Sequence, residues 1–273
     1  MNDNPIHMAV KAGKSLSGLA TVIDTHGHGG PWYNFWAPAN DPDSMVRILD
    51  RLGVEALVFC PHLGIGADPA IGNDIAIEWS RKYPGRLLGY AAFHPHEPES
   101  GRDELNRALD QGLVAIKLHP SVHQCSVQAP AYRIAWEVAK ERSTFILSHT
   151  WYNCPYCAPK MFAQLAADYP QVPVILGHSG GTPAGFPEAI ELARTYSNLY
   201  LDTCGSYVTG EWVVRMVQAV GADRVVYGSD LPFIDARYGL GKVALSGLGL
   251  DQLRMVLGLN AKRLLAAASV YIG

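Results

Sequence analysis

The sequence has few charged residues, no long apolar run and no excess of basic side chains. Charged residues make up 17% of the 273 residues, and the formal net charge is -3. A chain with this balance offers no basic surface for nucleic acid or anionic lipid. No apolar stretch approaches the roughly 20 residues that a membrane-spanning helix needs. The first residues also lack the apolar core of a signal peptide, so we expect a cytoplasmic protein.

Cysteine is also scarce. The five cysteines are an odd number, and a chain of this length does not need disulfides to hold a core together. We therefore expect free thiols in a reducing compartment. Two of them form the motif Cys154-Pro155-Tyr156-Cys157, which could be a redox dithiol or half of a zinc site. No second C-x-x-C is present to complete a structural zinc site, so we interpret the stretch as a loop at the mouth of a pocket.

The chain alternates between short apolar runs and segments with helical spacing of apolar residues. Each apolar run is too continuous for a half-exposed strand and indicates a strand buried on both faces, as in a parallel sheet. The first predicted strand begins at Val22. The other predicted strands are residues 54–60, 87–93, 113–118, 144–147, 172–176, 199–202 and 224–227. The predicted helices are residues 43–52, 73–83, 102–111, 131–142, 160–169, 187–196, 211–220, 251–257 and 260–268.

Eight strand–helix units in this length predict a single TIM (β/α)8 barrel. The alternative is an open, doubly wound sheet, but no glycine-rich phosphate loop follows the first strand. No linker or low-complexity segment divides the chain. We therefore expect one domain over residues 1–273, with residues 1–19 as an N-terminal extension.

Titratable side chains gather where the predicted strands end. In a TIM barrel these carboxyl ends form the active-site face. Of the ten histidines, only His7, His96 and His123 lie elsewhere. Isolated loop histidines would not be distributed in this way. The residues at strand ends are His26, His28, His62, His94, Lys117, His119, His149, His178 and Asp230.

The first strand ends in Asp24-Thr25-His26-Gly27-His28. Residues two apart on a strand project from the same face, so both imidazole rings are expected to converge. Two neutral imidazoles make half of a site for zinc, nickel, copper or iron. Two loop histidines without a ligand role are the alternative. Asp24 is expected to hydrogen-bond near the site rather than bind metal.

Six motifs span nearly the whole chain in order. They are I-D-T-H-G-H (23–28), I-K-L-H-P (116–120), L-S-H-T (147–150), I-L-G-H-S-G-G (175–181), V-Y-G-S-D-L-P-F (226–233) and L-N-A-K-R-L-L (259–265). With these motifs the chain resembles the amidohydrolase superfamily. Within it, the similarity is to the amidohydrolase-2 group, which includes the aminocarboxymuconate semialdehyde decarboxylases.

This resemblance implies a metal site with four ligands: His26, His28, His149 and Asp230. Such a donor set suits one Zn²⁺ per chain with a bound water, with Mn²⁺ or a second metal as alternatives. Asp230 would accept the proton of the water, and His178 would act as acid or base. Alternatively, His178 would bind a second metal or orient a neighbouring group. The resemblance also suggests a homodimer.

Five further residues are expected to contact the substrate. A buried Lys117 must be paired, so we expect it to contact a carboxylate of the site or of the substrate; bridging two metals is the alternative. His119 is expected to line the pocket. Arg237, in the eighth loop, would bind an anionic group. Trp32, within the aromatic loop of residues 31–36, and Tyr152 would contact the rest of the substrate.

The expected function is metal-dependent hydrolysis of a small-molecule amide, lactone or ester by an activated water. The alternative is non-oxidative decarboxylation or hydration of a small carboxylic acid on the same scaffold. A second alternative is a non-enzymatic barrel that keeps a metal for stability. The expected partner is a small-molecule substrate, with neither nucleic acid nor membrane.

Overall fold

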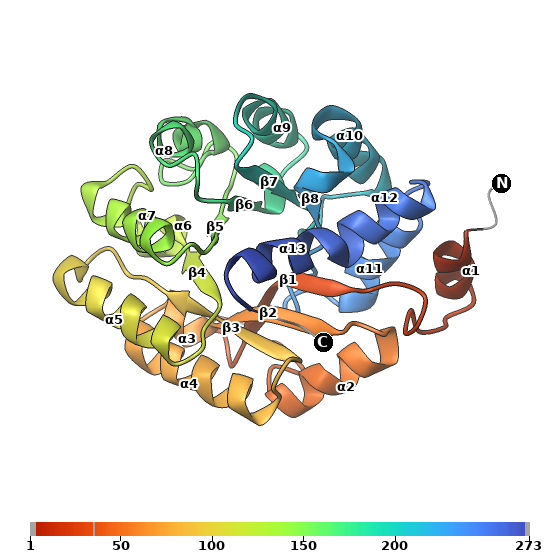
Figure 1. Ribbon diagram of the computed structural model, residues 1–273, viewed down its shortest axis with the longest axis horizontal. Helices are drawn as coiled ribbons and strands as arrows, with labels where there is room; N and C mark the ends of the chain where they lie inside the picture. The colour runs from red at the N-terminus through yellow and green to blue at the C-terminus, as the bar shows by residue number, and fades with distance from the viewer. Residues whose placement is uncertain (1–3, 35, 271–273) are drawn as a thin grey trace.

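Eight parallel strands form one sheet in which each strand pairs with the next along the chain. The structure, a computed structural model, describes residues 4–34 and 36–270. The sheet curves into a nearly closed barrel surrounded by helices (Figure 1). This arrangement confirms the predicted TIM barrel. The strands are β1 (Ile23–Gly29), β2 (Ala56–Pro61), β3 (Leu87–Ala92), β4 (Ala115–Leu118), β5 (Ile146–His149), β6 (Val174–Gly177), β7 (Leu199–Asp202) and β8 (Val225–Val226).

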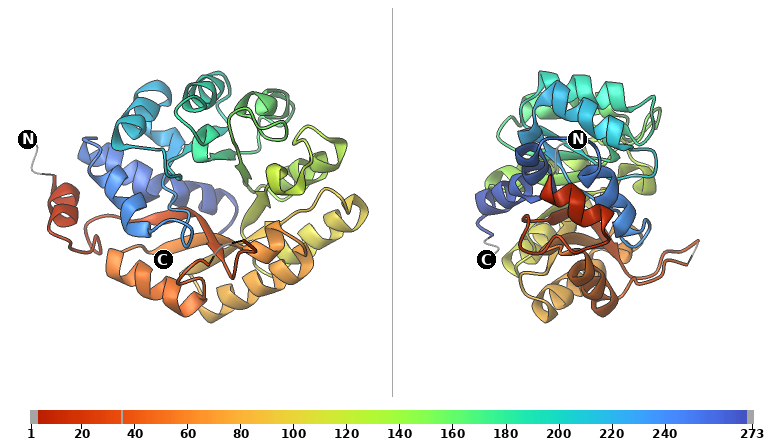
Figure 2. Two further views of the ribbon diagram at one scale, coloured as in Figure 1. Left: turned by 180° about the vertical axis from the view of Figure 1, so that it is seen from behind. Right: turned by 90° about the vertical axis from the view of Figure 1, so that its right-hand side faces the viewer.

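The helices form the outer layer, as both views in Figure 2 show. Short 3₁₀ segments precede or follow several of them, and one π-helical segment lies near the C-terminus. The α-helices are α1 (Pro5–Lys11), α2 (Pro42–Leu52), α3 (His62–Ile65), α4 (Pro69–Lys82), α5 (Pro98–Asp110), α6 (Pro120–His123), α7 (Pro130–Glu141), α8 (Ala163–Asp168), α9 (Phe186–Thr195), α10 (Gly210–Val220), α11 (Ala236–Ala244), α12 (Leu250–Arg254) and α13 (Asn260–Ala267). The other segments are η1 (Pro159–Phe162), η2 (His178–Gly180), η3 (Ala222–Arg224) and the π-helix η4 (Met255–Leu259).

The barrel strands are buried on both faces because the helices cover the outside and side chains fill the inside. Every residue of β2 and β3 is buried. The inner cluster of apolar side chains includes Ile23 and Ala56, the first residues of β1 and β2, together with Leu264 and Leu265 of α13. Thus α13 closes the amino-terminal end of the barrel. The opposite end, where the strands finish, is left for a site.

The barrel closes through the residues that follow β8 rather than through β8 itself. The N–H of Thr25 donates to the carbonyl of Tyr227 (2.9 Å), and the N–H of Asp230 donates to the carbonyl of His26 (2.8 Å). A third bond joins the N–H of His28 to the carbonyl of Leu231 (2.7 Å). The first strand and the last loop are therefore joined at the positions of the expected ligands.

The observed elements differ from the predicted ones chiefly in four places. The N-terminal extension contains α1, a short helix capped by the Asn4 side chain. The eighth loop, predicted to lack regular structure, contains α11, whose two glycines weaken its helical signal. The predicted helix 160–169 begins with the 3₁₀ segment η1. The two predicted C-terminal helices run together through η4. None of these differences moves a strand end.

The segment after β1 projects from the barrel (Figure 2, right). Within it, Tyr33 and Trp36 are 83% and 82% exposed, so these two rings do not cover the site. Phe35, part of the predicted aromatic loop, lies outside the described residues. Among the described residues, no helix combines the length and the apolar character that a membrane crossing requires.

Candidate metal centre

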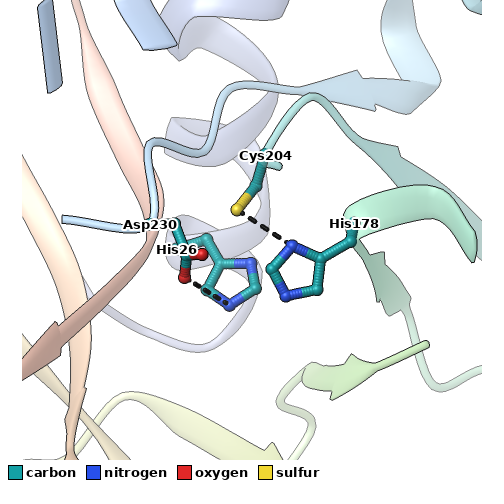
Figure 3. A group of neighbouring side chains, drawn as sticks. All are labelled: His26, His178, Cys204 and Asp230. Carbon is teal, nitrogen blue, oxygen red and sulfur yellow. Dashed lines mark hydrogen bonds and ion pairs between the residues drawn. The ribbon is translucent and has the colours of Figure 1, made fainter. Parts of the chain in front are cut away.

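Four buried side chains at the carboxyl end of the barrel bring their donor atoms within 4.8 Å of one another. One comes from within β1, and the other three come from the segments that follow β6, β7 and β8 (Figure 3). Their donor atoms are two imidazole nitrogens, a thiol sulfur and a carboxylate oxygen. The residues are His26, His178, Cys204 and Asp230.

His26 is oriented by a buried carboxylate. Its Nδ1 lies 2.7 Å from Oδ2 of Asp202, the last residue of β7, and both side chains are fully shielded from solvent. Because a carboxylate accepts, Nδ1 carries the ring proton and Nε2 keeps its lone pair. Nε2 lies 3.9 Å from Oδ1 of Asp230. Gly228 makes room for this pair, since a Cβ there would lie 2.4 Å from Oδ1 of Asp202.

His28 is oriented in the same way by a backbone carbonyl. Its Nδ1 lies 3.2 Å from the carbonyl oxygen of Cys60, and its Nε2 lies 3.5 Å from Oδ1 of Asp230. Asp24 contacts the backbone beside the ligands. Its Oδ1 accepts from the N–H groups of His26 (3.1 Å) and Ser229 (3.0 Å). The structure thus confirms that Asp24 supports the site through hydrogen bonds.

Asp230 and His178 both have a left-handed backbone, with φ of 67° and 62°. This conformation is costly for residues other than glycine and recurs at functional sites. Burial raises the pKa of the Asp230 carboxyl to about 7. Burial lowers the pKa of His178 well below its ordinary value, and neighbouring His26 and His149 lower it further. The ring is therefore neutral at physiological pH.

His149 stands beside this cluster but is not one of its four members. Its ring centroid is 4.8 Å from that of His178 and 4.1 Å from that of His119, on which it stacks. Its Nδ1 is buried and has no hydrogen-bond partner. Burial lowers the pKa of both His149 and His119 well below the ordinary value. A neutral imidazole with a free nitrogen suits a ligand role.

Lys117 points inward, as predicted, but its contact is an imidazole rather than a carboxylate of the protein. It is 1% exposed, and its Nζ lies 3.0 Å from Nε2 of His26. Burial lowers its pKa. A metal on that nitrogen would compete with this contact, so metal binding and the position of Lys117 are linked.

The structure does not bring Arg237 to the cluster. Its side chain is 78% exposed, and its Nε lies 3.0 Å from both carboxylate oxygens of Asp235. The guanidinium is thus paired with its own neighbour, two residues earlier in the chain. Sequence position in the eighth loop suggested proximity, but α11 turns this side chain toward solvent.

Two aromatic residues were also predicted to contact substrate, Trp32 and Tyr152. Trp32 packs edge-on against His62, with ring centroids 5.2 Å apart, and His62 in turn stacks on His28 at 5.1 Å. The ring of His62 therefore lies between Trp32 and His28 of the candidate metal centre. The backbone N–H of Tyr152 donates to the carbonyl of Gly180 (2.9 Å), which joins the fifth loop to the sixth.

The residues fit a divalent metal. The Nε2 atoms of His26 and His28 and the carboxylate of Asp230 converge, and each imidazole has its other nitrogen committed to an acceptor. Metal-binding histidines have this arrangement in general. Asp202 and Cys204 were not predicted. Asp202 is the last residue of the predicted seventh strand. It could have been found in the same way as the other residues, which were chosen because they lie where predicted strands end.

A family model described as Amidohydrolase matches residues 23–266. The chain therefore belongs to the amidohydrolase family. It has the barrel of that family and, at the ends of the strands, the histidines and the aspartate described above.

The curated relatives are decarboxylases. One is gamma-resorcylate decarboxylase of Rhizobium sp., 25% identical over 256 residues that cover 70% of this chain and 76% of that protein. Among solved structures, 2,6-dihydroxybenzoate decarboxylase from Rhizobium matches with a TM-score of 0.75 at 17% identity, covering 90% of this chain and 99% of the other. The 5-carboxyvanillate decarboxylase of Novosphingobium aromaticivorans, complexed with manganese and a nitrobenzoic acid, matches with a TM-score of 0.74 at 12% identity, covering 93% and 98%.

These names bear on the expected reaction. The chain is an enzyme of the amidohydrolase superfamily. Hydrolysis, the reaction we expected first, has no support among these relatives. The alternative, decarboxylation, is the activity for which they are named.

Proposed function

We propose that the chain is a metal-dependent, non-oxidative decarboxylase of a small aromatic carboxylic acid. One observation carries the proposal: the Nε2 atoms of His26 and His28 converge on the Asp230 carboxylate in a buried site of a chain whose relatives are named decarboxylases. Burial excludes water, which favours carbon–carbon cleavage over hydrolysis.

We assign the metal to His26, His28, His149 and Asp230. Three imidazoles and one carboxylate suit zinc, and manganese is the metal in the similar 5-carboxyvanillate decarboxylase structure. When bound, the ion supplies Lewis-acid polarisation of substrate oxygens. We assign Lys117, whose Nζ lies 3.0 Å from Nε2 of His26, to bind an anionic oxygen of the substrate.

Decarboxylation consumes one proton and releases CO₂, because a carbon–hydrogen bond replaces the carbon–carboxylate bond. The chain must therefore deliver a proton to carbon. His178 is a buried member of the cluster to which the metal assignment gives no role. We assign the delivery to His178: as its Nε2 proton passes to carbon, Nδ1 takes up a replacement proton that comes ultimately from solvent, so that the ring stays neutral.

The remaining pocket residues suit a flat ring. His119 and His149 stack at 4.1 Å, and Trp32 lies edge-on to His62. Stacked and edge-on arrangements are those in which aromatic rings attract one another. We assign Tyr152, on the fifth loop, to contact a polar substituent of the ring.

The test is incubation of the metal-loaded chain with hydroxybenzoates such as 2,6-dihydroxybenzoate, with CO₂ and the phenol measured together. We expect equal amounts of both products, and none from the His26→Ala variant. A parallel panel of lactones, amides and esters is the control. Hydrolysis of that panel without CO₂ release from any acid would overturn the proposal.

A further inference from the structure

Cys204 lies in the buried cluster, and none of the roles assigned above uses it. Its side chain is fully buried, and its Sγ lies 3.3 Å from Nδ1 of His178 (Figure 3). It stands in the loop directly after β7, two residues beyond Asp202. The contact joins the seventh and sixth loops of the barrel.

The thiol and the imidazole are held together by one carboxylate. Asp202 accepts from the backbone N–H of Cys204 through Oδ1 (2.9 Å) and from the backbone N–H of His178 through Oδ2 (3.0 Å). The Asp202 carboxylate therefore fixes the backbone positions of both Cys204 and His178. Gly205 follows with φ of 114°, and a Cβ there would lie 3.5 Å from Nδ1 of His178. The chain thus passes close to that nitrogen.

The thiol also hydrogen-bonds to the Asp230 carboxyl, but with Asp230 bound to a metal, Nδ1 of His178 is the acceptor that remains. A thiol is a weak donor and a still poorer acceptor, whereas the unprotonated nitrogen of a neutral imidazole accepts well. When S–H donates to Nδ1, the ring proton must be on Nε2. The second nitrogen of His178 points away from the thiol (Figure 3). The ring centroid lies 4.7 Å from that of His26 and 4.8 Å from that of His149.

We infer that Cys204 is a positioning residue whose thiol donates to Nδ1 of His178 and so holds that ring in the tautomer with its proton on Nε2. This inference rests on the proposed role of His178 in proton transfer. The resting enzyme then presents a donor to the substrate rather than a base. Delivery of a proton to carbon requires such a donor, and the ring stays neutral because Nδ1, beside the thiol, takes up the replacement proton.

The tautomer is tested directly by NMR on the full chain loaded with zinc and labelled with ¹⁵N-histidine. Long-range ¹H–¹⁵N spectra distinguish a protonated from an unprotonated ring nitrogen, and the His178→Asn spectrum identifies the signals of His178. We expect an Nε2-protonated ring in the parent chain and in Cys204→Ser, whose hydroxyl also donates. In Cys204→Ala we expect a mixture of tautomers. Cys125→Ala, away from the cluster, is the matched control and should match the parent.

Two results would overturn the inference. One is an unchanged His178 signal in Cys204→Ala. The other is a thiolate-to-metal charge-transfer band in the cobalt-loaded parent that Cys204→Ser removes, because this would make Cys204 a metal ligand. These measurements need no turnover, so they stand whether or not the chain is a decarboxylase. In kinetics, we expect Cys204→Ala to lower kcat with little change in KM, and Cys204→Ser to restore it.

Discussion

The Nδ1 of His26 lies 2.7 Å from Oδ2 of Asp202, and both side chains are buried completely. This contact fixes which nitrogen of His26 is available to a metal. The same carboxylate also accepts from the N–H of His178 and of Cys204. A residue that contacts no substrate thus orients three members of the cluster.

Replacing Asp202 by Asn should weaken metal binding without unfolding the barrel. The amide can donate to Nδ1, which removes the preference for the tautomer that leaves Nε2 free. We expect metal affinity to fall about 10- to 100-fold, the usual scale for a residue that orients a ligand. Competition with a chromogenic chelator measures it. Asp251→Asn, at a 95% exposed side chain, is the control. Equal affinities for all three proteins would contradict the role of Asp202.

Gly228→Ala should damage both the site and the fold. The new Cβ would lie 2.4 Å from Oδ1 of Asp202 and 2.8 Å from Cβ of His26, in a region with no free space. We expect a loss of about 1–3 kcal/mol in the free energy of unfolding, together with lower metal content. Urea denaturation and elemental analysis measure the two effects.

Gly241→Ala is the matched control for that substitution. Its new Cβ meets nothing within 4 Å, and the position lies inside α11. Alanine there should stabilise the chain by about 0.5–1 kcal/mol through helix propensity. If both variants behaved alike, the close approach at Gly228 would not be the cause.

Lys117→Met should reduce turnover and leave the metal content unchanged when the metal is saturating. The substitution keeps most of the side-chain volume and removes the charge beside Nε2 of His26. We expect kcat/KM to fall on the order of 100-fold, the scale of losing one buried charged contact. Metal per chain should stay at the parent value. A drop from two metals to one would instead identify Lys117 as a bridge between metals.

His123 should make stability depend on pH under acidic conditions. Its Nδ1 lies 2.7 Å from the hydroxyl of Tyr132 and its Nε2 lies 3.2 Å from the carbonyl of Ile65. Burial lowers its pKa to about 3. Between pH 3 and about 6.5 the unfolded chain binds a proton that the folded chain does not, so stability falls as the pH falls through this window.

His123→Gln should remove this contribution to the pH dependence, because the glutamine side chain binds no proton in the folded or the unfolded chain. At pH 5 we expect the slope of unfolding free energy against pH to drop by about 1.4 kcal/mol per pH unit. Tyr132→Phe keeps the imidazole and removes its hydrogen-bond donor, so it should lower stability while leaving most of the slope. Urea titrations at half-unit pH steps would measure both. An unchanged slope in His123→Gln would assign the acid sensitivity to other groups.

Arg237→Ala should be nearly silent. The side chain is exposed and paired with Asp235, and exposed pairs contribute little to stability. We expect kcat/KM within about twofold of the parent on any accepted acid, in contrast to Lys117→Met. A large rise in KM alone would restore Arg237 as an anion-binding residue, which would require α11 to move when substrate binds.

The sequence predicted the barrel and most of the cluster for a physical reason. Parallel strands buried on both faces appear as continuous apolar runs, and a barrel gathers the residues after each run at one of its ends. His26, His28, His178 and Asp230 were found in this way. The position of a residue after an apolar run gives the end of the barrel on which it lies, but not the direction of its side chain. Arg237 lies at the expected end of the barrel, yet its side chain points to solvent.

Cys204 is the opposite case, a residue of the cluster that the sequence did not indicate. It follows β7 by two residues, but cysteine in an apolar context is usually a small core residue. Only the distance from its sulfur to His178 distinguishes the two roles. Likewise, the partner of Lys117 could not be read from the sequence, because burial alone does not decide between carboxylate and imidazole.

The closing hydrogen bonds between β1 and the loop after β8 have a consequence for how the enzyme becomes active. His26 and Asp230 are 204 positions apart in the chain. The hydrogen bond from the Asp230 N–H to the His26 carbonyl is one of those that join β1 to the loop after β8. A nascent chain released before this loop is made would hold the first two histidines without their carboxylate. Closure of the ring and convergence of these ligand residues therefore depend on the same hydrogen bonds, and a chain that ends before residue 230 lacks both.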